Sequence, residues 1–303
     1  MSVANEMRRA VYLSAATYSI FPIFVIWYLW LEPPAAPGFA IGPLVMLQLI
    51  LSGRWDLVCY PLRIVFLGLL LATTAYRAGW WPAVLVLICF VTVSILFRRP
   101  PLAEDVALEF PLHRGIYYIA HGGSSSLLNR HHGSDSQQFA LDIVALGFLG
   151  ARASGIYPKR LGDYRIFGRS VYSPCHGIVT AVVDAFPDTL PGQMDKRNPA
   201  GNHIVIRHAD SDIYIGLAHL MKGSVLIRAE ERVHAGQLLA CVGNSGHSSE
   251  PHLHLHAKRG GDPESMLDGY GVPVRLGGRW LIRNSVVYPL GLHWGQWKGI
   301  FLL

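Results

Sequence analysis

The spacing of apolar residues divides the chain into two parts with different patterns. In the first part, residues 10–31 and 78–97 contain no charged side chain, and each is long enough for a helix to cross a bilayer. Residues 37–52 and 57–76 are weaker candidates, because the first follows a proline-rich stretch and an arginine interrupts the second. We therefore expect three or four transmembrane helices within residues 1–99. Interfacial or re-entrant segments are the alternative for the two weaker candidates.

Beyond residue 100 the pattern changes to short apolar runs separated by turn residues. Arg98-Arg-Pro-Pro101 marks the boundary, because two prolines end a helix and begin an extended segment. Runs of four to seven residues rich in β-branched side chains follow, which is typical of strands; they include Gly177–Val183, His203–Arg207, Ile213–Leu217 and Gln237–Gly243. No stretch here has a long helical period. We expect a mainly β domain of antiparallel sheets, sandwich- or barrel-like, behind an α-helical transmembrane region.

This pattern predicts four segments along the chain. They are a membrane anchor (1–99), a linker leading into the domain (100–120), the β domain (121–290) and a C-terminal tail (291–303).

Composition separates the same two parts. Only 15% of the residues are charged, against about 25% in a typical soluble domain. The first hundred residues hold seven arginines and no lysine or histidine, so all 14 histidines lie in the second part. The net charge of +6 comes mostly from arginines beside apolar runs rather than from a cluster on a folded face. This distribution argues against nucleic-acid binding.

The same arginines bear on membrane topology. Four spans with the N-terminus inside would place most of them in the cytoplasm, as the positive-inside rule favours, and would leave the β domain there too. Three spans would place the β domain on the far side, against the charge bias.

The segment Pro251-His-Leu-His-Leu-His256 carries the most informative pattern for chemistry. If it is a strand, its three imidazoles point to one face, because alternate residues share a face. A plain core strand would not carry three polar rings on one side, since each buried ring needs a hydrogen-bond partner. Imidazole is a common zinc ligand, and catalytic zinc sites combine three protein ligands with a water. Further candidate groups precede it, in Asn129-Arg-His-His132, in Gln137-Gln-Phe-Ala-Leu-Asp142 and in Leu217-Ala-His-Leu220.

In this order, these motifs resemble the lysostaphin/LytM-type zinc endopeptidases of cell-wall metabolism. The resemblance covers about residues 129–260 and includes Gly201-Asn-His-Ile-Val-Ile-Arg-His208 and the Gly-Asn-Ser-Gly run at 243–246. It implies the duplicated hybrid motif fold. By position, it also implies that His131, Asp142 and His254 bind Zn²⁺, while His219 and His252 act on the catalytic water and the oxyanion.

Three details of this site stay open. His132 is an alternative to His131 as the ligand. Asp135 would give the short His–Asp spacing of the simplest family members, but Ile143-Val144 after Asp142 better matches a strand leaving the metal site. The third histidine, His256, stands where the family often has an acidic residue, so its role is not assigned.

The resemblance implies a zinc endopeptidase that hydrolyses the peptide cross-links of bacterial peptidoglycan, and the apolar segments of residues 1–99 predict that it is membrane-anchored. The expected partners are that peptide substrate and the lipid bilayer, without nucleic acid; no protein partner is predicted. We expect a multi-pass protein of the bacterial inner membrane with an extracytoplasmic catalytic domain, because the motifs are more specific than the arginine distribution.

Two other functions are compatible with parts of the sequence. A non-catalytic LytM-like module that binds or activates a cell-wall amidase is the main alternative, although such modules usually lose metal ligands that this chain keeps. A cytoplasmic phosphocarrier domain shares the hybrid-motif fold and would suit four spans. It would not need the upstream His131 and Asp142.

Overall fold

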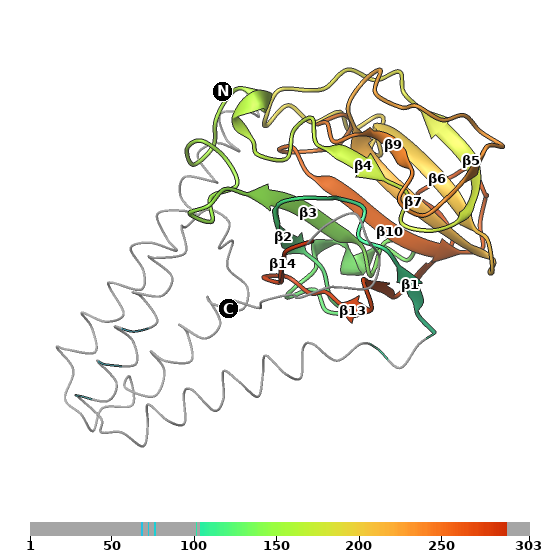
Figure 1. The fold of residues 1–303 in the computed structure, drawn as a ribbon, viewed down its shortest axis with the longest axis horizontal. Coiled ribbons are helices and arrows are strands. Elements are labelled where there is room, and N and C mark those ends of the chain that lie inside the picture. The colour runs from blue at the N-terminus through green and yellow to red at the C-terminus, as the bar shows by residue number, and fades with distance from the viewer. Residues whose placement is uncertain (1–67, 69–71, 73–75, 77–100, 102–103, 290–303) are drawn as a thin grey trace.

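The computed structural model describes residues 68, 72, 76, 101 and 104–289. Apart from residues 68, 72 and 76, which are helical, this part is β structure with two short 3₁₀ helices, η2 (Arg130–Gly133) and η3 (Leu161–Asp163). The predicted mainly β, antiparallel character of the domain is confirmed (Figure 1).

The strands in chain order are β1 (Val106–Leu108), β2 (Ile116–His121), β3 (Leu141–Leu146), β4 (Ser170–Tyr172), β5 (Gly177–Val183), β6 (Asn202–His208), β7 (Ile213–Leu220), β8 (Arg232–Val233), β9 (Leu238–Cys241), β10 (Leu253–Arg259), β11 (Tyr270–Val272), β12 (Val274–Leu276), β13 (Arg279–Trp280) and β14 (Val286–Val287).

The predicted membrane spans lie outside the described residues, except for the three helical positions named above. Among the residues that the structure does describe, no helix combines the length and apolar character needed to cross a bilayer. The predicted tail at 291–303 also falls outside the described part. The number of spans and the side of the membrane that the domain occupies stay predictions.

A nine-stranded sheet dominates the domain. Its order is β14-β2-β3-β10-β7-β6-β5-β8, with β11 paired to the far end of β10, and all these pairs are antiparallel. A two-stranded sheet, β4-β9, and a three-stranded sheet, β1-β12-β13, complete the described fold. The pair β1–β12 is parallel, and both β1 and most of β2 lie within the segment 100–120, which we expected to be a linker.

Residue alternation along β10 separates the core from the functional face. Leu253 and Leu255 are completely buried in the main core together with Val171 of β4 and Leu239 of β9. Strands β4 and β9 therefore cover this face of the large sheet (Figure 1). Burial of each leucine contributes on the order of 2 kcal/mol, and a one-residue slip would exchange the leucines for histidines. This penalty fixes the register that presents the intervening histidines to the opposite face.

The neighbouring strands β3 and β7 follow the same alternation. Leu141 and Ile143 of β3, and Ile215 and Leu217 of β7, belong to the main core. The residues between them face the same side of the sheet as the β10 histidines. On this face Asp142 of β3 lies beside the histidines of β10, and β7 contributes the small residues Gly216 and Ala218.

Candidate active site

Three side chains from separate parts of the chain meet on this face of the large sheet. His131 Nε2 lies 2.9 Å from Asp142 Oδ2, and His254 Nδ1 lies 2.9 Å from Asp142 Oδ1. Asp142 on β3 and His254 on β10 are directly paired across the two strands, so the backbone register sets the second contact. The donor atoms of all three residues lie within 4.8 Å of one another.

Asn129 holds the segment that carries His131. This fully buried side chain accepts a hydrogen bond from the His131 backbone N–H at 3.0 Å and caps the start of η2. Its amide nitrogen donates to three carbonyls, those of Gly123, Gln138 and Ala140. Such a network positions the imidazole of His131 against β3, although η2 itself buries no residue.

The two alternative ligands lie elsewhere. His132 is not part of the three-residue cluster, and its Nδ1 is buried without a hydrogen-bond partner among the described residues. Asp135 is exposed and lies beyond the described cluster. Of the candidate pairs considered from the sequence, the structure brings together His131 and Asp142.

The charge states of this cluster suit a metal. Burial raises the pKa of Asp142. The charges of His131 and His252, together with hydrogen bonds from His131 and His254, lower it by more than burial raises it, so the pKa lies well below its usual value. Burial lowers the pKa of His254 to about 4. The site therefore offers a carboxylate and a neutral imidazole at neutral pH.

Zn²⁺ fits this donor set. Two imidazoles and one carboxylate are a common zinc combination that leaves a fourth position for water or substrate. A second group, His219, His252 and His254, also has its donor atoms within 4.8 Å of one another. The group with Asp142 is the better candidate for a dication, because it contains a carboxylate, whereas Nδ1 of both His219 and His252 is hydrogen-bonded to a backbone carbonyl.

A β-bulge places His219 on the functional face. Asn202 on β6 pairs with Leu220 on β7, but the next residue of β6 pairs with Ala218, so His219 is an extra residue in β7. Leu217 and Leu220 both lie in the core, which leaves Ala218 and His219 on the other side. His219 has a φ of 61°, in the left-handed region that side chains other than glycine rarely adopt. Bulges of this kind commonly redirect a side chain beside an active site.

The hydrogen bonds of His219 fix the orientation of its ring. Its Nδ1 lies 2.8 Å from the Ser245 carbonyl oxygen, which can only accept, so Nδ1 carries the proton and Nε2 keeps a free electron pair. Burial, and secondly the charges of His252 and His254, hold the pKa of His219 well below its usual value. The ring is thus a neutral hydrogen-bond acceptor directed at the cluster.

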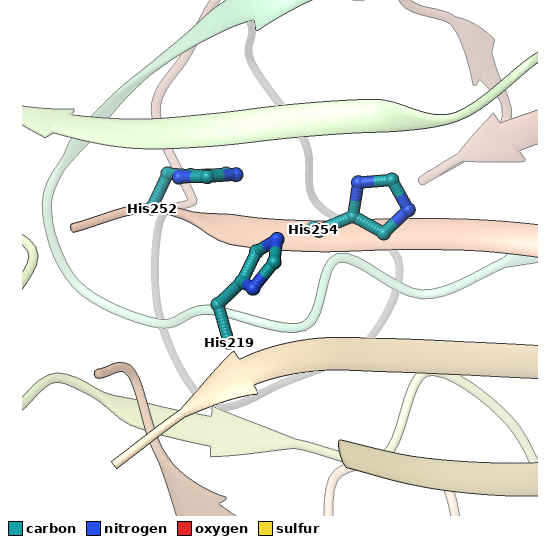
Figure 2. A group of neighbouring side chains, drawn as sticks. All are labelled: His219, His252 and His254. Carbon is teal, nitrogen blue, oxygen red and sulfur yellow. The ribbon is translucent and has the colours of Figure 1, made fainter. Parts of the chain in front are cut away.

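His252 is held in the same way from the other side. It immediately precedes β10, and its Nδ1 donates to the carbonyl of Glu250 at 2.8 Å. Its Nε2 lies 3.6 Å from Asp142 Oδ1, and its ring centroid lies 4.7 Å from that of His219. Figure 2 shows the three histidines close together, with the rings of His219 and His252 extending toward His254. The sequence expectation placed His252 within the strand; the structure instead places it one residue before β10.

A buried ion pair that sequence reasoning missed supports His252. Arg152 Nη2 lies 2.6 Å from Glu250 Oε2, and its Nε lies 3.1 Å from the same oxygen. Both side chains are at most 5% exposed. The pair joins the segment after β3 to the turn whose carbonyl orients His252. No local pattern indicates it, since the partners are 98 residues apart.

A cavity of about 190 Å³ opens over these groups. Its lining includes His131, His219 and His254 on one side, and Met266 and Leu267 from the segment after β10. Its volume suits one or two residues of an extended peptide rather than a large cofactor.

Comparison with known proteins finds a family whose sequence model matches part of the chain. Residues 163–265 match the sequence model of peptidase family M23. This range contains His219, His252 and His254, while His131 and Asp142 precede it. Over 63 residues, 21% of the chain, the sequence is 40% identical to the DD-carboxypeptidase/endopeptidase Mpg of Neisseria meningitidis serogroup B (strain ATCC BAA-335 / MC58), and this match spans 14% of that protein.

Solved structures with low similarity to this chain were also found. The M23 metalloprotease pseudoalterin, from the deep sea, is 16% identical, with 61% of this chain and 99% of that chain covered and a TM-score of 0.33. A zinc-containing peptidase from Vibrio cholerae is 22% identical, with 50% and 37% covered and a TM-score of 0.28. The catalytic domain of lysostaphin from Staphylococcus simulans is 19% identical, with 35% and 77% covered and a TM-score of 0.25.

Proposed function

We propose that this chain, a member of peptidase family M23, is a zinc endopeptidase that hydrolyses peptide cross-links of peptidoglycan. One observation carries the proposal. Asp142, His131 and His254 form a compact donor set, and two further histidines each tie Nδ1 to a backbone carbonyl and direct Nε2 toward that set. A binding module would not need both a metal donor set and two oriented, non-ligand imidazoles.

The chain's own residues supply the proton transfers of peptide hydrolysis. When bound by His131, Asp142 and His254, zinc would polarise the scissile carbonyl and lower the pKa of an attacking water to about 7. His219, with its free electron pair on Nε2, accepts a proton from that water. His252, when Nε2 also carries a proton taken from solvent, donates a hydrogen bond to the oxygen on which negative charge develops and keeps that proton throughout. The proton taken by His219 then passes to the leaving amine as the C–N bond breaks.

We also propose that residues 1–99 anchor the domain in the inner membrane, with the domain on the extracytoplasmic side. The apolar segments of the sequence support the anchor, and the location of peptidoglycan supports the side. A reporter fused behind residue 303 tests the side directly. Activity of the reporter only in the cytoplasm would contradict this part of the proposal.

The enzymatic proposal is tested on the purified full chain. We expect about one zinc per chain and release of new amino termini from purified peptidoglycan, with both lost on treatment with a chelator and restored by zinc. His219→Ala and His252→Ala should retain zinc but release no amino termini. Zinc-free wild type that nevertheless activates a cell-wall amidase would overturn the proposal in favour of the non-catalytic module.

A further inference from the structure

His256 is a third histidine of β10 that the proposed reaction does not use. It is 1% exposed and lies on the same face of β10 as His254, two residues away. Its Nδ1 lies 3.1 Å from His254 Nε2, the ring nitrogen on the side opposite to Asp142. The two imidazoles therefore continue the chain of polar contacts that begins at the carboxylate of Asp142.

The fold reserves space for this ring. Gly216 of β7 is paired directly with His256 across the sheet. A Cβ atom at Gly216 would come within 2.4 Å of Met266 Cε and 3.0 Å of His256 Cε1. Glycine at this point is required by packing rather than by backbone conformation. Any other residue there would displace either the ring or Met266, which covers it.

We infer that His256 is a positioning residue, which accepts a hydrogen bond from His254 and so keeps the metal-binding nitrogen of His254 unprotonated and aimed at the metal. The inference rests on the proposed zinc site. A neutral imidazole carries one proton; if Nδ1 of His254 supplies its electron pair to zinc, the proton is on Nε2. At 3.1 Å, Nδ1 of His256 is then the acceptor.

His256 differs chemically from the carboxylate that commonly supports a metal-bound histidine. His256 is 1% exposed and presents a ring nitrogen, Nδ1, to His254 at 3.1 Å, so the acceptor here is an imidazole nitrogen rather than a carboxylate oxygen. A neutral acceptor draws less negative charge onto His254 than a carboxylate would. The metal in this chain would therefore keep more of its positive charge.

The test compares two substitutions on the full chain. Asparagine places its amide oxygen near the position of Nδ1 and preserves an acceptor, whereas leucine fills the space without one. We expect His256→Leu to weaken zinc binding by about 10–100-fold, the usual range for residues that support a ligand, and His256→Asn to stay within a few-fold of wild type. Zinc affinity is measured by competition with a chelator, and His208→Leu at the end of β6 serves as a control.

A second readout separates positioning from simple packing. In the zinc-loaded protein, the Nε2 proton of His254 should give a sharp, slowly exchanging NMR signal in wild type and His256→Asn, and no such signal in His256→Leu. Thermal unfolding of each apo-protein reports whether the variant is folded. Equal zinc affinity of wild type and folded His256→Leu would overturn the inference, as would equal loss in both substitutions.

These outcomes are distinct from failure of the proposed function. If the wild type binds zinc but leaves peptidoglycan intact, the endopeptidase proposal fails while the affinity series still decides the role of His256. If the wild type binds no zinc, both fail.

Discussion

Asp142 and His254 lie directly opposite each other on adjacent antiparallel strands, with Oδ1 of the aspartate 2.9 Å from Nδ1 of the histidine. The backbone pairing of β3 and β10 therefore sets the geometry of the candidate metal site. Strands fix the positions of side chains more precisely than loops do, which favours a donor set that is already arranged in the metal-free protein.

Asp142→Asn should remove the negative charge that this site offers to a metal dication. We expect zinc affinity to fall by more than about 100-fold, because loss of a supporting residue typically lowers metal affinity by about 10–100-fold and loss of a ligand should lower it more. Release of amino termini from peptidoglycan should cease. Metal content and amino-terminus release measure the two effects. Asp135→Asn is the matched control, because Asp135 is exposed and should leave both unchanged. Equal effects of the two substitutions would count against the assignment.

The left-handed backbone at His219 predicts an unusual order of stability. Both His219→Gly and His219→Ala should abolish hydrolysis. The glycine variant should be more stable by about 1–2 kcal/mol, because only glycine adopts a φ of 61° without steric cost. Urea denaturation measures the difference. At the neighbouring Ala218, an ordinary strand position, substitution by glycine should instead destabilise by about 0.5–1 kcal/mol. If His219→Ala is more stable than His219→Gly, as wild-type Ala218 is expected to be more stable than Ala218→Gly, the backbone at His219 is not strained and the prediction is wrong.

The buried pair of Arg152 and Glu250 should behave as a unit. Arg152→Leu alone should cost about 3–5 kcal/mol, because it leaves the carboxylate of Glu250 buried without its partner, and Arg152→Leu/Glu250→Leu should recover much of that loss. A double-mutant cycle in urea measures the coupling. The exposed pair of Arg259 and Asp212 provides the comparison, with a coupling below about 1 kcal/mol. Similar couplings in the two pairs would contradict this prediction.

Glu109 should make stability depend on pH. Burial raises the pKa of this carboxyl from its ordinary value of 4.5 to about 7, and its Oε2 lacks a hydrogen-bond partner among the described residues. Between these two pH values the folded protein holds a proton that the unfolded chain has released. The free energy of unfolding should therefore fall as pH rises from 4.5 to 7.

Glu109→Gln should remove this component and be more stable than wild type at pH 8. Urea denaturation at pH 5 and pH 8 provides the measurement, with the exposed Glu264→Gln as a control that keeps the wild-type slope. An unchanged slope in Glu109→Gln would show that another group is responsible.

Short-range patterns in the sequence were sufficient for much of the fold. The run Gly177–Val183 was predicted with the bounds that β5 has, because β-branched residues and flanking turn residues mark a strand locally. The motifs, through the family resemblance, also named Asp142 and the four histidines that the structure brings together near it, His131, His219, His252 and His254, with His132 left as an alternative to His131. Alternation along a strand indicated that His254 and His256 share a face, and they do.

Features that depend on pairing between distant segments were not predictable in this way. The bulge at His219 exists because β6 and β7 pair with an offset, which no property of residues 213–220 reveals. The Arg152–Glu250 pair and the fit of Gly216 against His256 likewise depend on which strands become neighbours. Only the glycine itself, within a run of β-branched and large residues, was a signal that another group approaches closely.

The strand order of the large sheet also has a consequence during translation. Asp142 leaves the ribosome 112 residues before the histidine that pairs with it, and His219 emerges between the two. If the proposed roles hold, a growing chain lacks one metal ligand and one catalytic imidazole until residue 254 has been added. On the proposed mechanism, products of premature termination upstream of His254 would carry an incomplete site and would not hydrolyse a peptide substrate.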